Sequence, residues 1–102
     1  MKTLFILNDA PYGTERSYNG LRLARSLSKM AEETVRVFLM GDAVACAKSG
    51  QKVPEGYYNA GDMVRMAGGE VALCGTCMDA RALTEAEIVP GSRRSTLKEL
   101  TE

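Results

Sequence analysis

The sequence predicts a three-layer α/β domain built around a mainly parallel sheet, and three observations lead to this prediction. Three short apolar runs at 3–7, 35–40 and 70–74 have the character of buried strands. The segments between them contain apolar residues at helical spacing, and strands that alternate with helices form parallel sheets covered by helices. The chain has 102 residues, which suits one hydrophobic core and not two.

The N-terminal part is expected to fold as strand, helix, strand. The uninterrupted run 3–7 suits a strand buried on both faces of the sheet. A polar loop follows at 8–13, and Thr14 can cap a helix that continues to about Glu32. Residues 35–40 form the second strand. The inward face of the helix is predicted from its spacing to contain Leu23, Ala24, Leu27, Met30 and Ala31.

The middle of the chain is expected to contain two helices and a long loop. The first helix covers 42–50, with Asp42 as its cap and Gly50 as its stop. The aromatic loop 51–58 is long enough to be a flap or an interface segment, and an ordinary surface loop is the alternative. A third helix at 59–67 then leads into the strand 70–74.

The C-terminal part is predicted to be helical at 78–87, extended at 88–89 and turned at 90–91. Thr96-x-x-Glu99 is a capping box that opens a last helix over 97–102.

Charge and length exclude several classes of function. Thirteen Lys and Arg balance thirteen Asp and Glu, so no nucleic-acid, anionic-membrane or acidic-substrate partner is expected. No apolar run is long enough to cross a bilayer, and the N-terminus lacks the apolar segment of a signal peptide. Three cysteines cannot all pair, which favours a reducing compartment.

The segment Cys74-Gly75-Thr76-Cys77 is the candidate for chemistry, because reactive groups gather beyond the carboxyl ends of parallel strands. The chain has no histidine, which excludes Ser–His and Cys–His hydrolases. A helix N-terminus lowers the pKa of a cysteine, so Cys74 and Cys77 are the expected nucleophiles. Thr76 can cap the following helix, and Asp42 and Arg81 are expected to support the thiols. The alternative for Cys74 is a buried strand cysteine without chemistry.

Other functional interpretations of the cysteines and loops fit the sequence less well. Structural zinc needs four ligands, whereas the chain offers one Cys-x-x-Cys and a distant Cys46, so no metal is expected. Cys46 is expected to fill the core. A thioredoxin-type motif is normally flanked by an aromatic residue, and Leu73 is not one. The loop 8–14 is neither a P-loop nor a G-x-G-x-x-G turn, and a rigid loop explains it better than a nucleotide site.

Several motifs, in order, resemble the DsrE/DsrF-like family, and most closely its small YchN-type members. The likeness extends to about Leu100. It rests on Asn8–Glu15, Leu21–Ala24, Val37–Val44, Gly50–Lys52, Glu55–Tyr57 and Leu73–Asp79.

The resemblance implies a flavodoxin-like three-layer sandwich in the cytoplasm, assembled as a homotrimer or hexamer, with no organic cofactor. Residues 1–102 would form one such domain, in which the C-terminal edge strand of the family is absent or truncated. Better-understood relatives carry sulfane sulfur as a persulfide on a cysteine that follows the corresponding strand. By its distance from the strand, that cysteine matches Cys74, and Cys77 belongs to the YchN-type pattern.

The leading hypothesis is therefore a sulfurtransferase-like sulfur carrier that works between a sulfur donor protein and an acceptor protein. Cys74 accepts sulfane sulfur as a persulfide, and Cys77 resolves it by forming a disulfide and releasing sulfide. One alternative is a non-catalytic oligomeric interaction module with structural cysteines, in which the loop 53–58 packs between subunits. Another is a dithiol redox or metal-sensing protein.

Overall fold

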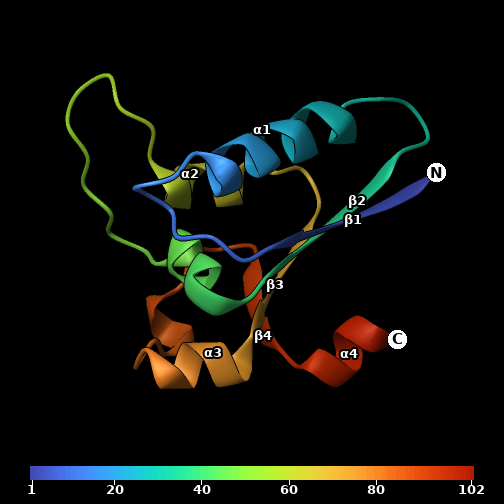
Figure 1. The fold of residues 1–102 in the computed structure, drawn as a ribbon. Helices are drawn as coiled ribbons and strands as arrows, with labels where there is room; N and C mark the ends of the chain where they lie inside the picture. Colours follow the sequence, from blue (N-terminus) through green and yellow to red (C-terminus); the bar gives the residue numbers. More distant parts are fainter.

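The structure is a computed structural model that describes all residues from Met1 to Glu102, and it confirms a single parallel α/β domain. Figure 1 shows the order of its elements along the chain. They are β1 (Lys2–Leu7), α1 (Arg16–Ser28), β2 (Thr34–Leu39), the 3-10 helix η1 (Gly41–Ala47), α2 (Ala60–Arg65), β3 (Glu70–Cys74), α3 (Gly75–Ala80), the 3-10 helix η2 (Glu85–Glu87), β4 (Ser92–Ser95) and α4 (Leu97–Thr101).

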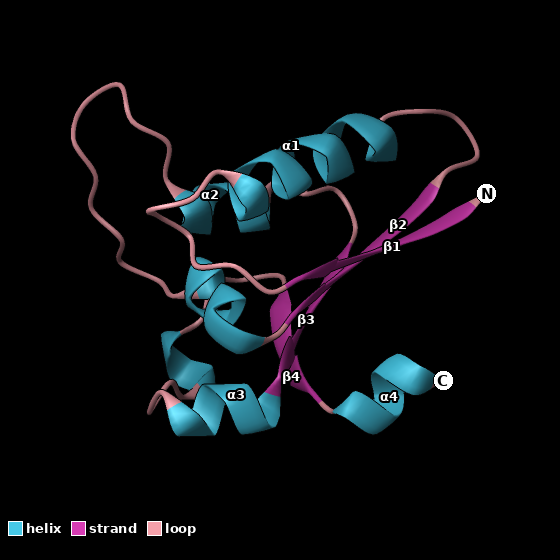
Figure 2. Ribbon diagram, in the orientation of Figure 1, coloured by secondary structure: helices cyan, strands magenta, loops and turns pink.

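The four strands are parallel and follow one another across the sheet in the order β1-β2-β3-β4. This order has no reversal, in contrast to a flavodoxin sheet. Right-handed crossovers that all advance in one direction place their helices on one face of the sheet. Accordingly α1, η1, α2 and α3 cover one face, while α4 lies on the other (Figure 2).

The side chains of each strand alternate between these two unequal faces. The helix-covered face carries the main core of 17 buried residues, which includes Val37, Leu39 and Leu73. The opposite face has a small buried cluster of Phe38, Ala72 and Cys74, with Leu100 of α4 packed against it. Cys74 therefore points to the sparsely covered face of the sheet.

The prediction that the first strand is buried on both faces is wrong. Only Phe5 and Leu7 of β1 pack against the main core. Leu4 and Ile6 point to the opposite face and remain 48% and 47% exposed. The strand order makes β1 an edge strand, and this position could not be inferred from its apolar sequence.

The helix α1 is shorter than predicted and is rotated about its axis. It begins at Arg16 and ends at Ser28, and the Thr14 hydroxyl accepts a hydrogen bond from the Arg16 N–H at 3.2 Å. Its buried face contains Ser17, Leu21 and Ala24, at a spacing of four and three residues. Three residues predicted to face inward are exposed: Leu23 within the helix, and Met30 and Ala31 beyond its end.

Two predicted helices in the middle of the chain are present with changed ends. The segment predicted at 42–50 is the 3-10 helix Gly41–Ala47, which begins after Met40, so Asp42 is inside the helix and does not cap it. The next helix is Ala60–Arg65, and the Asn59 side chain caps it by accepting the Asp62 N–H at 3.0 Å.

The region after β3 differs most from the prediction. In place of a helix over 78–87, α3 begins directly at Gly75 and ends at Ala80, and η2 forms a separate turn. The predicted short strand at 88–89 contributes only an isolated bridge from Ile88 to Lys48. The fourth strand is instead Ser92–Ser95, which pairs with β3.

The last helix is confirmed at Leu97–Thr101. The Thr96 hydroxyl accepts the Glu99 N–H at 3.1 Å, as a cap should. The Glu99 carboxylate does not complete the capping box, because it binds Arg93 and Ser95. No helix of the structure has both the length and the apolar character needed to cross a membrane.

Candidate functional site

The two cysteines of the motif lie at an abrupt junction between β3 and α3. Cys74 is the last residue of β3 and also the residue before the first turn of α3. No loop separates the two elements, so Thr76 falls inside the first helical turn and is exposed. The expectation that Thr76 caps this helix is therefore wrong; its contribution is its backbone N–H.

The Cys74 side chain lies in the small cluster on the open face of the sheet. The residue is 7% exposed and packs with Phe38 and Ala72, while Met40 and Leu100 border the cluster. These neighbours are apolar, and burial among them favours the neutral thiol.

Burial is the largest single effect on the pKa of Cys74, and it raises this pKa. Several other groups near Cys74 favour the thiolate, and together they outweigh burial. They are the backbone N–H and thiol of Cys77, the backbone N–H of Thr76 and the positive charge of Arg94. Together they hold the pKa of Cys74 below its ordinary value. Since the thiolate is the nucleophile, this shift makes Cys74 more reactive at a given pH than an ordinary cysteine.

Cys77 connects this junction to the loop that follows β2. Its side chain is half-buried, and its sulfur accepts a hydrogen bond from the Gly41 N–H at 3.2 Å. Gly41 has a φ of +56°, a conformation that glycine adopts at little cost. This turn presents the donor to the sulfur, so both thiols lie where the carboxyl ends of β2 and β3 meet.

Asp42 and Arg81 are brought together, although not at the sulfur atoms. Arg81 Nη2 lies 2.8 Å from Asp42 Oδ1, and Arg81 Nη1 donates to the Cys77 carbonyl at 3.0 Å. The pair joins the η1 segment to α3 at the surface. Arg81 contacts the Cys77 carbonyl and no sulfur atom, and the positive charge that lowers the pKa of Cys74 is that of Arg94. The position of Arg81 therefore does not support its expected role as the cation that activates a thiol.

Arg94 is the cation that acts on Cys74, and the sequence analysis missed it. Its guanidinium binds both oxygens of the Asp79 carboxylate, at 2.8 and 3.0 Å. No periodicity signals its strand, because Ser92–Ser95 contains no apolar residue. The only signal available was the Arg93-Arg94 pair itself, directly after the predicted turn.

Cys46 differs from the other two cysteines, and its predicted place in the core is confirmed. Its side chain is fully buried in η1 within the main cluster. This burial raises the pKa of Cys46 to about 11. The thiol is therefore protonated at neutral pH and is a poor nucleophile. The structure does not bring three or more His, Cys, Asp or Glu side chains together in an arrangement that could hold a metal ion.

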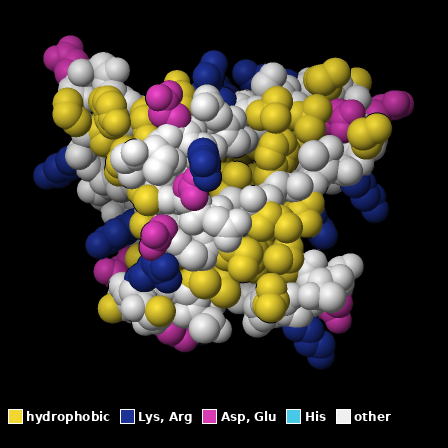
Figure 3. Space-filling model, viewed as in Figure 1, with side chains coloured by type: hydrophobic (Ala, Val, Ile, Leu, Met, Phe, Trp, Pro, Cys, Tyr) yellow, Lys and Arg dark blue, Asp and Glu magenta, His cyan; other side chains and the backbone are white.

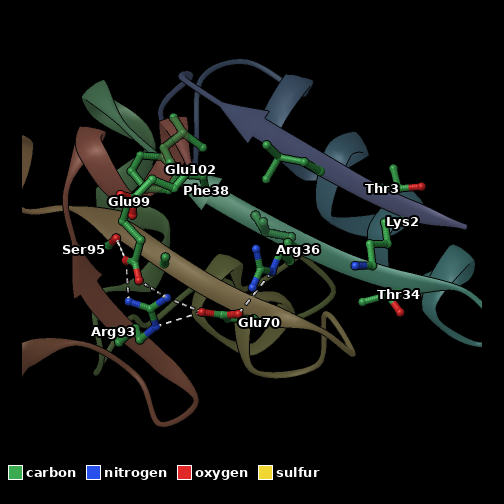
Figure 4. A pocket seen from close by; sticks show the side chains of 14 residues that line it. Lys2, Thr3, Thr34, Arg36, Phe38, Glu70, Arg93, Ser95, Glu99 and Glu102 are labelled. Carbon is green, nitrogen blue, oxygen red and sulfur yellow. Dashed lines mark hydrogen bonds and ion pairs between the residues drawn. The ribbon is translucent and has the colours of Figure 1, made fainter.

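A cavity of about 370 Å³ opens beside the small cluster of Phe38, Ala72 and Cys74, on the face of the sheet that carries α4 (Figure 4). Phe38, Ala72 and Leu100 contribute its apolar wall. Its charged wall is a network in which Arg93 binds both Glu70 and Glu99. Figure 3 shows hydrophobic side chains gathered over the strands beside α4.

The aromatic loop 51–58 is held against the body of the protein. The Tyr58 ring packs against Tyr18 of α1 in a tilted arrangement, with ring centroids 4.3 Å apart, and its hydroxyl donates to the Pro11 carbonyl at 2.6 Å. The Tyr12 hydroxyl donates to the Gln51 side chain. These contacts fix both ends of the loop, while Tyr57 remains 52% exposed.

Comparisons with known proteins agree over nearly the whole chain. The model of the DsrE/DsrF-like family matches residues 1–102. Protein YchN of Escherichia coli K12 is 38% identical over 105 residues, which cover 99% of this chain and 89% of YchN. Protein MK0008 of Methanopyrus kandleri is 36% identical, with 93% of this chain and 79% of that protein covered.

Solved structures give the same result. The crystal structure of E. coli YchN superimposes with a TM-score of 0.89 at 38% identity, covering 98% of this chain and 88% of that one. The structure of MTH1491 from Methanobacterium thermoautotrophicum shares the fold, with a TM-score of 0.70 at 10% identity, covering 98% and 87% of the two chains. The chain thus belongs to the DsrE/DsrF-like family and is similar to YchN.

Proposed function

We propose that this protein is a sulfur carrier that holds sulfane sulfur as a persulfide on Cys74 and passes it to an acceptor protein. Membership of a family linked to sulfur relay supports this function. The observation that carries the proposal is the junction of β3 and α3. There an otherwise buried thiol faces two backbone N–H groups and a guanidinium, and its pKa is lowered.

Loading is a transfer of one sulfur atom with no net oxidation. The Cys74 thiolate attacks the outer sulfur of a donor persulfide anion, and a new S–S bond forms at Cys74. The S–S bond of the donor breaks, and the donor leaves as a thiolate with the electron pair. A single negative charge stays at Cys74 throughout. The N–H groups and Arg94 that favour the thiolate also favour the persulfide anion.

Delivery uses the same chemistry in reverse. An acceptor thiolate attacks the outer sulfur, and Cys74 leaves as the thiolate. Cys77 offers a second route, because it packs against the Cys74 cluster. Its thiolate attacks the inner sulfur of the protonated persulfide, a Cys74–Cys77 disulfide forms, and hydrosulfide leaves with the electron pair. An external dithiol must then reduce the disulfide, which suits the reducing cytoplasm.

The proximity of the two thiols also favours a second candidate function, a dithiol redox protein. In that case the Cys74–Cys77 disulfide is the product and no sulfur is carried. The two functions differ in one observable, which is the mass of the peptide that contains Cys74 after exposure to a sulfur donor.

We also infer that the chain assembles as a homotrimer or hexamer. An all-parallel sheet is normally covered on both faces, whereas Leu4 and Ile6 are left half exposed on the face that carries α4. Light scattering at micromolar concentration tests this inference. A monomer would contradict it.

The carrier function is tested by mass spectrometry of the native protein after treatment with a persulfidated sulfurtransferase. We expect one added sulfur atom on Cys74. Cys74→Ser should abolish loading, whereas Cys77→Ser should preserve it. Cys46→Ala is the matched control for loss of a thiol and should load normally. The proposal is refuted if Cys74→Ser still loads, or if the wild-type protein takes up no sulfur.

A further inference from the structure

Arg94 approaches the reactive junction from a neighbouring strand. It lies on β4 in register with Leu73, the residue before Cys74. Its guanidinium extends over Gly75, the residue after Cys74. A Cβ atom placed on Gly75 would lie 2.7 Å from Arg94 Cζ and 2.8 Å from Nε. The absence of a side chain at Gly75 is thus what admits the guanidinium to this position.

Asp79 fixes the guanidinium in place. The two parallel hydrogen bonds from Arg94 to the Asp79 carboxylate form the bidentate arrangement that orients a guanidinium most strictly. The interaction lowers the pKa of Asp79, so the carboxylate stays ionised well below neutral pH. Arg94 itself is 37% exposed, which leaves its charge open to a reactant arriving from solvent.

We propose that Arg94, braced by Asp79 and admitted by Gly75, is a positioning residue that fixes a positive charge beside Cys74 and makes the site prefer anionic reactants. The substrate class that follows is an anionic sulfur donor, such as a persulfide or polysulfide anion. This part rests on the proposed carrier function. The position of the Arg94 charge beside Cys74 does not depend on the carrier function.

Few other charges face Cys74, so the effect of Arg94 can be isolated. The neighbours of Cys74 from β2, from the residue after it and from α4 are Phe38, Met40 and Leu100, which carry no charge. From α3 the only titratable group in contact is the Cys77 thiol. Arg94 itself is faced by Asp79 and, at longer range, by Glu85.

The test is the alkylation rate of Cys74 as a function of pH, measured peptide by peptide with neutral iodoacetamide and with anionic iodoacetate. Removing a half-exposed cation should raise the midpoint of the pH profile by about 0.5–1 unit. Arg94→Ala should therefore slow alkylation below the midpoint by about 3–10-fold. It should also lower the iodoacetate-to-iodoacetamide rate ratio, which a purely structural role would not change.

Two further variants separate charge from folding. Arg94→Lys retains a cation without the planar fork and should keep part of the reagent ratio. Arg93→Ala is the matched control, because Arg93 is the adjacent arginine of β4 and binds Glu70 and Glu99 instead. It should leave both the midpoint and the ratio of Cys74 unchanged.

Loading of the same variants with inorganic polysulfide distinguishes the two proposals. If wild-type Cys74 takes up sulfur while Arg94→Ala and Arg94→Lys change neither midpoint nor reagent ratio, the role of Arg94 is overturned. If the ratio depends on Arg94 but wild-type Cys74 takes up no sulfur, the positioned charge stands, and the carrier function and its anionic donor fall.

Discussion

The loss of folding stability at alkaline pH tests quantitatively whether Cys46 is a buried structural thiol, in contrast to the reactive Cys74. Burial raises the pKa of Cys46 from 9.0 to about 11 in the folded protein. An acid whose pKa is higher in the folded state contributes stability below its unfolded pKa and loses it as pH rises through the folded pKa. A difference of about two units corresponds to about 2–3 kcal/mol, lost between roughly pH 9 and pH 11.

The measurement is the free energy of unfolding from urea titrations of wild type and Cys46→Ala at several pH values between 8 and 11. The difference between the two proteins cancels the contribution of the other ionisable groups. At pH 8 the wild type should be more stable by about 1–2 kcal/mol, because the variant leaves a small cavity. This advantage should disappear by pH 11. Parallel profiles would refute the assignment of Cys46 as a buried neutral thiol.

Three further predictions concern the reactive site and its surface. Cys77→Ser should lengthen the lifetime of the Cys74 persulfide, measured by mass spectrometry at successive times, because the internal thiol that discharges it is gone; an unchanged lifetime would show that Cys77 does not resolve the persulfide. Gly75→Ala should displace the Arg94 guanidinium and reproduce part of the slower Cys74 alkylation of Arg94→Ala, while a wild-type rate would contradict the close approach of this guanidinium to Gly75. Leu4→Glu should reduce the assembled state observed by light scattering, since it places a charge on the half-exposed apolar face, and an unaltered mass would place the interface elsewhere.

The sequence by itself determined the elements whose stability is local or whose burial is continuous. The runs around Val37 and Leu73 are mostly β-branched or apolar. The strand β2 was therefore predicted to within one residue at each end, and β3 was predicted with its observed bounds. The same reasoning located Cys74 at the carboxyl end of a strand. It also located the cap at Thr96, because a hydroxyl three residues before a free N–H is a local feature.

Tertiary structure decided the rest, because the deciding contacts join residues that are distant in the chain. Strand order made β1 an edge strand and left one face of the sheet thinly covered, although the β1 sequence reads as fully buried. Strand β4 has no apolar residue and is extended because β3 offers it backbone hydrogen bonds. That pairing alone brings Arg94 to Cys74, whereas Arg81, nearer in sequence, lies against Asp42 and the Cys77 carbonyl. Apolar periodicity carries no information about such partners, so the charge that acts on the thiol was visible only in the folded chain.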